Sequence, residues 1–329
     1  MICSIWRHID DWSRRESRIA SGLAAALILS GVFAASSFTA FPQTTARNTK
    51  STANELEHAR RLLDTAQWRD AEGLVKTYLD THSESADGHA LMGLILYREH
   101  QPRASMAEYL RASESADLTA FDLRIFALDC AAIPDLPEAE RWLERSLQKD
   151  ERDPATWEAL GHVRFAAQKY EGAIDALHHA LQLAPHTISS ETLIGVANER
   201  LAKPDAAEAA YKTAIAWQAG LKIKDPVPYI GMGRVLLANN QTADAIPYLQ
   251  QAVKAPQAPS EAHELLGLAY SRTSRNAEAA AEIEKAIQLD PQTARLHLML
   301  ARVYRSLGEK DKADAEQTQY AALKASTAQ

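Results

Sequence analysis

Small residues recur along this chain at a constant interval of 34 residues. Starting from residues 154–185, the interval leads to glycine or alanine at eight successive positions, with one interruption where four extra residues, 222–225, are inserted. Alanine and glycine together fill less than a quarter of the chain, so eight successive matches indicate an internal repeat rather than chance. The eight positions are Ala59, Gly93, Ala127, Gly161, Gly195, Gly233, Gly267 and Ala301.

A second small residue lies twelve residues after the first in every repeat, and in most repeats a large apolar residue lies four residues further on. A spacing of four keeps two side chains on one face of a helix. Two antiparallel helices approach closely only at small side chains, and larger apolar residues fill the spaces beside the contact. The pattern therefore predicts two packed helices per repeat, and proline ends repeats at Pro185 and Pro291. The large apolar residues are Val75, Tyr109, Leu143, Leu177, Tyr211, Leu249 and Ile283.

The four inserted residues, 222–225, fall between the fifth and sixth repeats. Four residues equal about one helical turn. We therefore expect the insertion to lengthen either the second helix of the fifth repeat or the loop after it, and to change the superhelix locally.

Residues 19–40 form an uncharged, largely apolar segment near the N-terminus. A helix of this length, at about 1.5 Å per residue, is just long enough to cross the apolar core of a bilayer. The segment also fits a signal peptide that is cleaved after Ser37. Three arginine residues at positions 14–18 favour export of the chain beyond this segment. We therefore expect a cytoplasmic region at residues 1–18, a signal peptide or single transmembrane anchor at 19–41, and a polar linker at 42–51.

Composition indicates the all-α class and limits the partners. Alanine is abundant and only 7% of the residues are aromatic, which favours closely packed helices over strands. The formal net charge is −7 and no run of five or six like charges occurs, which argues against nucleic acid as a partner. Cys3 and Cys130 are the only cysteines, and Cys3 precedes the apolar segment, so no disulfide is expected within the folded part.

Residues 263–267 read HELLG and come close to a zinc-protease motif. In H-E-x-x-H, two histidines four residues apart bind one Zn²⁺, but Gly267 takes the place of the second histidine here. His263 occupies a place that Trp157 and Tyr229 fill in other repeats, so we expect its ring to pack against a neighbouring helix. The glycines of residues 231–233 follow no strand, and no nucleophile and base form a local signature. The sequence predicts no enzyme, no metal site and no cofactor.

Two repeats resemble the tetratricopeptide repeat family, whose 34-residue unit carries a W-x₂-L-G-x₂-Y…A-x₃-F…A…P pattern. The matching residues are Trp157, Leu160, Gly161, Ala173, Leu177, Ala180 and Pro185 in one repeat, and Leu266, Gly267, Tyr270, Ala279, Ile283, Ala286 and Pro291 in the other. The resemblance implies an all-α, right-handed α-solenoid of about eight helix-turn-helix units over residues 52–327. The units are expected to start near residues 52, 86, 120, 154, 188, 226, 260 and 294.

The resemblance also implies that the first helices line a concave groove, with an apolar floor and more arginine than acidic residues. Two interpretations of the arginines remain open: they pair with neighbours on a helix face, or they bind a carboxylate-bearing partner. The residue set that clamps chaperone C-termini in this family has no counterpart here. The candidate partner-binding residues are Leu94, Tyr97, Leu128, Phe165, Arg200, Arg234, Arg272, Arg302 and Arg305.

These observations predict a non-enzymatic interaction scaffold outside the cytoplasmic membrane, with the membrane contacted only through the N-terminal segment. Its expected partner is a protein or peptide, and an acidic one if the arginines are free. A component of polysaccharide export that binds an acidic glycan is the alternative function, and an enzyme of unrecognised type is the third. The oligomeric state is left open.

Overall fold

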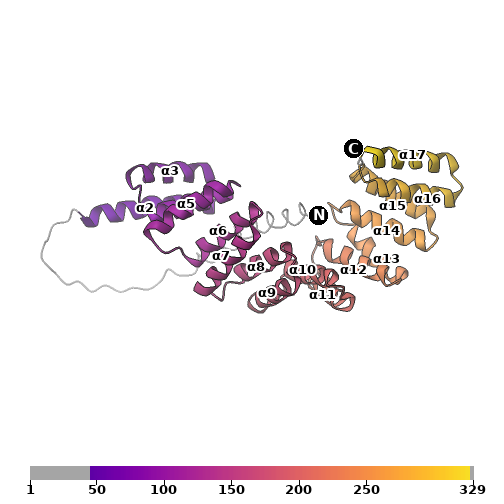
Figure 1. The fold of residues 1–329 in the computed structure, drawn as a ribbon, viewed down its shortest axis with the longest axis horizontal. Coiled ribbons are helices and arrows are strands. Elements are labelled where there is room, and N and C mark those ends of the chain that lie inside the picture. Colours follow the sequence, from indigo (N-terminus) through magenta and orange to yellow (C-terminus); the bar gives the residue numbers. More distant parts are fainter. Residues whose placement is uncertain (1–44, 327–329) are drawn as a thin grey trace. The chain divides into compact units, whose positions relative to one another are not determined.

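The computed structural model describes residues 45–326, which form sixteen helices and no strand. The helices follow one another as antiparallel pairs, as the sequence predicted (Figure 1). The described part of the chain divides into two compact units, one ending at Glu151 and the other beginning at Arg152. The array expected over residues 52–327 extends through both units.

Unit 1 contains three helix pairs. Its helices are α2 (Thr45–Asp64), α3 (Trp68–Thr81), α4 (Ala86–Arg98), α5 (Pro102–Ser115), α6 (Ala120–Ala132) and α7 (Leu136–Lys149). The first of them, α2, begins at Thr45, inside the segment that was expected to be a polar linker. The predicted signal peptide or anchor at residues 19–41 lies outside the described residues. None of the helices within residues 45–326 combines the length and the apolar character that a membrane crossing requires.

Unit 2 contains five helix pairs. Its helices are α8 (Pro154–Ala166), α9 (Tyr170–Leu183), α10 (Ile188–Arg200), α11 (Pro204–Trp217), α12 (Val227–Ala238), α13 (Thr242–Ala252), α14 (Ser260–Arg272), α15 (Asn276–Leu289), α16 (Ala294–Leu307) and α17 (Lys310–Ser326).

Local sequence signals set the helix ends. Pro102, Pro154 and Pro204 stand at the starts of α5, α8 and α11, where a missing backbone N–H leaves no hydrogen bond unmade. Thr119 and Asp122 form a capping box at the start of α6, each side chain accepting a hydrogen bond from the other's backbone N–H. These signals mark the starts of helices α5, α6, α8 and α11.

The predicted small sites are the points of closest contact between the two helices of a pair. Ala71, Ala173 and Ala279, which represent the second small site, are fully buried. A Cβ atom added to Gly161 of α8 would lie 2.6 Å from Cγ of Leu177 in α9, far inside normal contact distance. Gly93, Gly195, Gly233 and Gly267 meet the large apolar residue of their own pair in the same way. Glycine is required at these places because the facing side chain occupies the space of a Cβ.

Each turn between paired helices in unit 2 places one residue in the left-handed region, and four of these five residues are not glycine. In the first of these turns, the N–H of Lys169 donates to the carbonyl oxygen of Arg164 at 2.8 Å, which closes the end of α8. The same bond joins Arg275 to Tyr270 at the end of α14. The left-handed residues are Gln168, Ala202, Asn240, Ser274 and Gly308.

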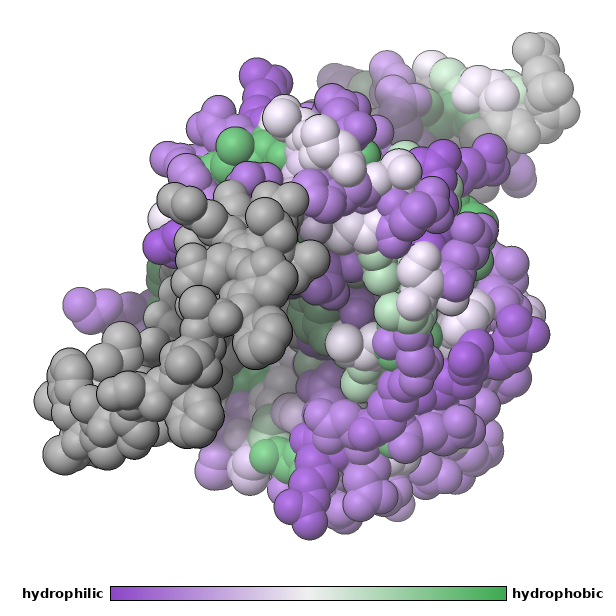
Figure 2. All heavy atoms as spheres, turned by 90° about the vertical axis from the view of Figure 1, so that its left-hand side faces the viewer, coloured by the Kyte–Doolittle hydropathy of each residue, from purple (hydrophilic) through white to green (hydrophobic). Residues whose placement is uncertain are grey.

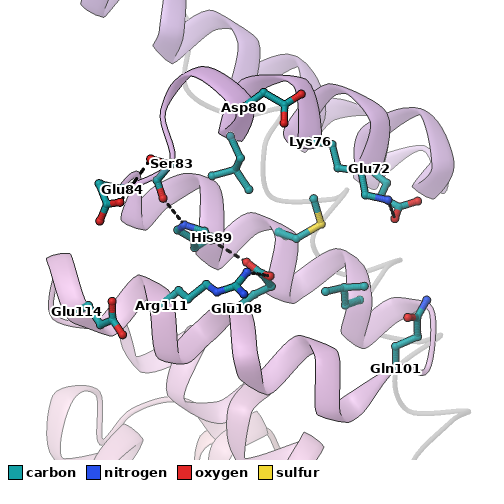
Figure 3. A pocket seen from close by; sticks show the side chains of 13 residues that line it. Glu72, Lys76, Asp80, Ser83, Glu84, His89, Gln101, Glu108, Arg111 and Glu114 are labelled. Carbon is teal, nitrogen blue, oxygen red and sulfur yellow. Dashed lines mark hydrogen bonds and ion pairs between the residues drawn. The ribbon is translucent and has the colours of Figure 1, made fainter.

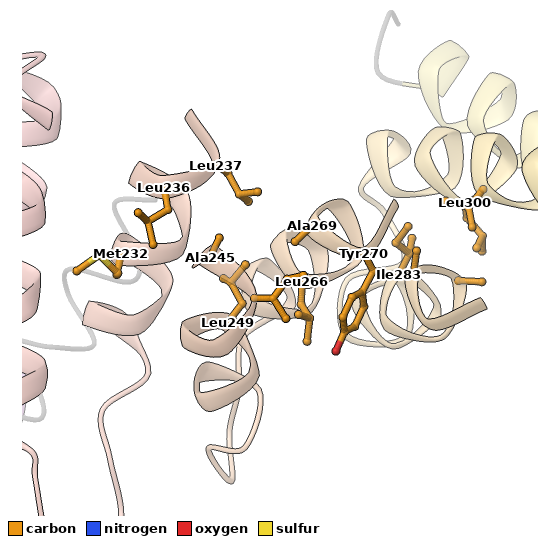
Figure 4. Close-up of a cluster of buried hydrophobic side chains, with 14 of the residues drawn as sticks. Met232, Leu236, Leu237, Ala245, Leu249, Leu266, Ala269, Tyr270, Ile283 and Leu300 are labelled. Carbon is orange, nitrogen blue, oxygen red and sulfur yellow. The ribbon is translucent and has the colours of Figure 1, made fainter. Parts of the chain in front are cut away.

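The core of unit 2 runs continuously through several repeats (Figure 4). Leu249, Leu266 and Ile283 are almost completely buried and come from three different helices. Leu300 of α16 and Ala313 of α17 continue the same cluster to the last pair. A solenoid of this kind is stabilised by contacts between neighbouring repeats rather than by one central core.

The inserted residues lengthen a loop and leave the helix before them unchanged. Helix α11 ends at Trp217 and has 14 residues, the same length as α9. In the loop that follows, the buried Gln218 accepts a hydrogen bond from the N–H of Asp225 at 2.6 Å, so the two ends of the insertion are tied together. Helices α11 and α12 still pack against each other across it. Leu221 and Ile223 are exposed on the loop.

Candidate partner-binding faces

The first helices of the repeats form one face of each unit. In unit 1, α2 contacts α4 and α4 contacts α6; in unit 2, the same contacts join α8, α10, α12, α14 and α16. Among the described residues, no comparable contact joins one second helix to the next. Each unit therefore has its first helices closer together than its second helices. We call the side lined by the first helices the inner face of that unit.

The inner face of unit 1 carries partly exposed apolar residues next to arginines. Leu94 and Tyr97 of α4 are partly buried, and Phe121 at the start of α6 is 39% exposed. The guanidinium of Arg98 lies 5.9 Å from the ring centre of Tyr97, and that of Arg124 lies 5.2 Å from the ring centre of Phe121. Figure 2 shows that hydrophilic residues cover most of the surface in its view, so exposed apolar side chains are few there. This aromatic and arginine cluster is a candidate contact surface.

Two of the predicted partner-binding residues pack inside the protein and do not lie on its surface. Leu128 of α6 and Phe165 of α8 are buried. The ring of Phe165 packs edge-on against Tyr170, with their centres 5.4 Å apart. Both side chains sit where the helix pair closes, so little of either is left for a partner to contact.

Arg234 of α12 connects three consecutive first helices. Its Nε and Nη2 donate to the two carboxylate oxygens of Glu199 in α10, at 2.8 and 3.0 Å, and its Nη1 donates to Glu261 in α14. The hydroxyl of Tyr211 donates to the same Glu199 carboxylate. A bidentate arginine and carboxylate pair is a strong and directional contact. The predicted carboxylate-binding residue Arg234 is therefore occupied within the protein.

This network shifts the pKa values of its members. Burial acts to lower the pKa of Arg234, but the hydrogen bonds and charge of Glu199 outweigh it and raise the pKa above its ordinary value. Burial and then the negative charge of Glu199 raise the pKa of Tyr211. Arg234 therefore stays charged and Tyr211 stays protonated over the accessible pH range.

Other arginines on the inner face of unit 2 also bond within the protein. Arg272 of α14 donates to the carbonyl oxygen of Leu237 at 2.8 Å and so closes the end of α12. Arg295 of α16 pairs with the largely buried carboxylate of Glu264 at 2.6 Å. Arg305 donates to the amide oxygen of Gln317 in α17 at 2.9 Å. These contacts favour the interpretation in which arginines pair with neighbours.

Arg302 and Arg200 are the two remaining predicted arginines. Both side chains are exposed, on α16 and α10 respectively. No hydrogen bond or ion pair joins the Arg302 guanidinium to another of the described residues. Of the predicted arginines, Arg302 is thus the one best placed to meet a carboxylate from outside.

The histidine of HELLG takes part in a contact that three repeats share. His263 Nδ1 lies 2.7 Å from Oε2 of Glu282 in the paired helix, and His89 and Glu108 lie at the same distance. His297 and Glu316 form the third pair, at 2.6 Å. In another repeat, Trp157 fills this place and its ring stacks on a histidine of α9. The slot therefore holds a ring against the second helix, as the sequence predicted.

A buried polar cluster in unit 1 was missed by the sequence analysis. Asp129 of α6 is 1% exposed, and burial raises its pKa to about 8 against a smaller opposing effect of the neighbouring Ser105. Ser105 already donates its proton to the carbonyl oxygen of Gly93 at 2.8 Å, so its oxygen can only accept. Burial also raises the pKa of Cys130 to about 12, which keeps the thiol unreactive. Within residues 45–326, no three histidine, cysteine or acidic side chains are grouped so that they could hold a metal ion.

Comparison with known sequences supports the repeat assignment and gives one distant relative. The tetratricopeptide repeat family model matches residues 230–292 and 266–329. The cellulose synthase operon protein C of Escherichia coli K12 is 44% identical over 62 residues. That match covers 19% of this chain and only 5% of the relative, so the likeness concerns a small part of both proteins.

Solved structures share the fold at low sequence identity. The C-terminal part of a repeat protein from Cytophaga hutchinsonii is similar with a TM-score of 0.59 at 12% identity, covering 74% of this chain and 99% of that one. PilF of Pseudomonas aeruginosa is similar with a TM-score of 0.55 at 18% identity, covering 66% and 97%. The family model thus shows the tetratricopeptide repeat in residues 230–329, and the solved structures show that the helix pairs of the chain share the same fold.

Proposed function

We propose that this protein is a non-enzymatic scaffold that binds a protein or peptide on the inner faces of its units. The observation that carries the proposal is the cluster on α4 and α6, where Leu94, Tyr97 and Phe121 remain partly exposed beside two arginines. Aromatic rings supply a large contact area with few rotatable bonds, and arginine is enriched with them at binding surfaces. An apolar segment of a partner fits this surface.

Acidic partners are favoured on the inner face of unit 2. Arg302 is exposed and Arg200 lies on the same kind of face, whereas Arg234 already holds two carboxylates. An exposed arginine forms a bidentate pair with an incoming carboxylate without breaking a bond inside the protein. The expected electrostatic contribution is modest and falls with salt, because Arg302 is in contact with solvent.

Peptide display against the full chain in mild detergent tests the binding proposal. Selected peptides should carry aromatic or aliphatic residues, acidic residues, or both. Tyr97→Ala should weaken an aromatic or aliphatic peptide by roughly tenfold at any salt concentration. Arg302→Ala should weaken an acidic peptide mainly at low ionic strength. Leu74→Ala, which trims an exposed apolar residue of the second helix α3, is the matched control. If Tyr97→Ala and Arg302→Ala both bind the selected peptides with wild-type affinity, the proposal is wrong.

The proposed location is outside the cytoplasmic membrane, with residues 19–41 as an anchor or cleaved signal. The support is the uncharged apolar segment with arginines ahead of it. Alkaline phosphatase is active only after export, so a fusion after residue 329 should be active in a bacterial host. Mass spectrometry of the mature protein then shows whether residues 19–41 are retained as an anchor or removed as a cleaved signal. An inactive fusion that is made at a normal level would contradict export.

A second function is supported by the likeness to cellulose synthase operon protein C. In this second function the protein is a component of polysaccharide export, and the exposed Arg302 of its inner face binds an acidic glycan. Titration with an acidic and a neutral oligosaccharide of equal length separates the alternatives. Binding of the acidic one, lost in Arg302→Ala, supports the glycan function; binding of neither leaves the peptide scaffold as the better account.

A further inference from the structure

The side of unit 1 opposite its inner face has a hollow between the second helices α3 and α5 (Figure 3). Its volume is about 880 Å³. Leu79, Met92 and Leu96 supply apolar surface, and the buried ring of His89 lies between the two helices. This α3–α5 hollow is lined by residues that the function proposed above does not use.

Acidic side chains surround the α3–α5 hollow, and they fall into two groups. Glu108 accepts hydrogen bonds from His89 and Arg111, both at 2.7 Å, and Glu72 pairs with Lys76 at 2.6 Å. These carboxylates are compensated within the protein. The second group has no cationic partner among the described residues, and it consists of Asp80, Glu84 and Glu114.

A smaller hollow of about 560 Å³ lies on the other side of α5, between α5 and α7. Glu114 lines both hollows, so they adjoin across α5. The α5–α7 hollow is lined by polar and apolar side chains in similar measure. Leu110 at its edge is 51% exposed, and the rings of Phe126 and Trp142 lie 4.8 Å apart within it. An exposed leucine beside the buried ring of Phe126 and the partly exposed ring of Trp142 offers a seat for an apolar side chain.

We propose that the two hollows together bind one extended segment of a partner protein, in which lysine or arginine residues adjoin a large apolar residue. The basic residues lie over the α3–α5 hollow, where Asp80, Glu84 and Glu114 supply uncompensated negative charge. The apolar residue lies against Leu110 in the α5–α7 hollow. Charge complementarity selects the occupant, because an acidic segment would be repelled by the same three carboxylates.

This site is distinct from the inner face in position and in chemistry. The inner face of unit 1 presents the partly exposed Leu94, Tyr97 and Phe121, whereas the hollows add carboxylates that have no cationic partner among the described residues. The two faces therefore select partners of different chemistry. A scaffold with both faces in use would hold two different partners on unit 1 at the same time.

Synthetic peptides test the proposal on the full chain in mild detergent by fluorescence anisotropy. The probe is a labelled peptide of about twelve residues with four lysines next to a leucine and a tryptophan. One counterpart has glutamate in place of lysine, and the other has glycine in place of leucine and tryptophan. The probe should bind roughly tenfold more tightly than either counterpart, since each lacks one of the two required features.

Three sets of variants locate the binding. The combined variant Asp80→Asn, Glu84→Gln, Glu114→Gln should weaken the probe roughly tenfold at low salt, and less at high salt. Leu110→Ser should weaken it by roughly threefold at every salt concentration. The matched control Asp175→Asn, Asp311→Asn, Asp314→Asn removes three exposed charges of unit 2 and should leave affinity within about twofold.

The outcomes separate this site from the inner face. If the control variant loses as much affinity for the probe as the combined variant does, the attraction is a general one between net charges, and the proposal is overturned. Wild-type affinity of the probe for the combined variant Asp80→Asn, Glu84→Gln, Glu114→Gln also overturns the proposal. Probe binding that is abolished by Tyr97→Ala but kept by the combined variant would mean that the basic segment binds on the inner face. The two-hollow proposal would then be wrong, and the proposed scaffold function would stand. Unchanged circular dichroism melting in each variant shows that the fold is intact.

Discussion

Replacing Asp129 with asparagine should remove a pH dependence from the stability of unit 1. Asp129 is 1% exposed in α6, and burial raises its pKa from 3.8 to about 8. The folded protein therefore keeps the proton up to about pH 8, whereas the unfolded chain releases it near pH 4. Between these values the folded state binds more protons than the unfolded state, so stability falls as the pH rises.

The size of this effect is set by the difference in pKa. Each unit of difference corresponds to about 1.4 kcal/mol, so the free energy of unfolding should fall by about 3 kcal/mol between pH 5 and pH 7 through this group alone. Asparagine has nearly the same shape and does not titrate. The variant should therefore gain stability relative to the wild type as the pH rises, and the gain should level off above about pH 8.

Hydrogen exchange measured by mass spectrometry on peptides from α6 and α7 reports this quantity for unit 1 directly. Comparison of variant and wild type at equal pH cancels the intrinsic exchange rate. Asp175→Asn, an exposed position in α9, is the control and should change nothing in these peptides. Parallel stability curves for wild type and Asp129→Asn from pH 5 to pH 8 would show that Asp129 is ionised when folded and would refute the reasoning.

Three further predictions concern unit 2. Gly161→Ala places a Cβ atom 2.6 Å from Leu177 Cγ and should lower stability by about 1–3 kcal/mol in a melting experiment. Adding Leu177→Ala should restore part of this stability, whereas additive losses would contradict the contact. Gln168→Gly relieves a residue at φ +61° and should stabilise by about 0.5–1 kcal/mol in urea unfolding, whereas a loss would mean that the left-handed turn is not formed. Arg234→Ala should lower the free energy of unfolding in urea by about 1–2 kcal/mol. Glu199→Gln should cost less stability in the Arg234→Ala variant than in the wild type, and additive losses would disprove the shared network.

The repeat and its packing could be predicted from the sequence because they depend on the size of single residues. Gly161 and Leu177 mark one contact by size alone, and the same contrast of a small and a large residue returns in most pairs. The turns were not predicted in the same detail. Among the left-handed residues in the turns between paired helices of unit 2, only Gly308 is a glycine, so residues such as Ala202 gave no local signal for their conformation.

The candidate site was harder to predict because it depends on what lies across from each residue. Arg234 and Arg302 occupy the same place in their repeats and are indistinguishable by pattern. Arg234 has Glu199 before it and Glu261 after it on neighbouring helices, whereas Arg302 lies in the last helix pair of the described residues. Burial of Phe165 was likewise set by its neighbour Tyr170. Position within a repeat identifies a face, and the adjacent repeats decide which side chains remain available.

The loop after α11 shows how a protein of this kind can acquire new features without rebuilding its helices. The Gln218 side chain joins the loop ends by bonding Asp225, so residues between them extend outward while α11 and α12 stay packed. Doubling the length of such a loop costs only about 0.6 kcal/mol of closure entropy. Segments of foreign sequence, such as an epitope or a fluorescent label, can therefore be grafted between residues 219 and 224. The join between the fifth and sixth helix pairs is a natural attachment point on an otherwise periodic surface.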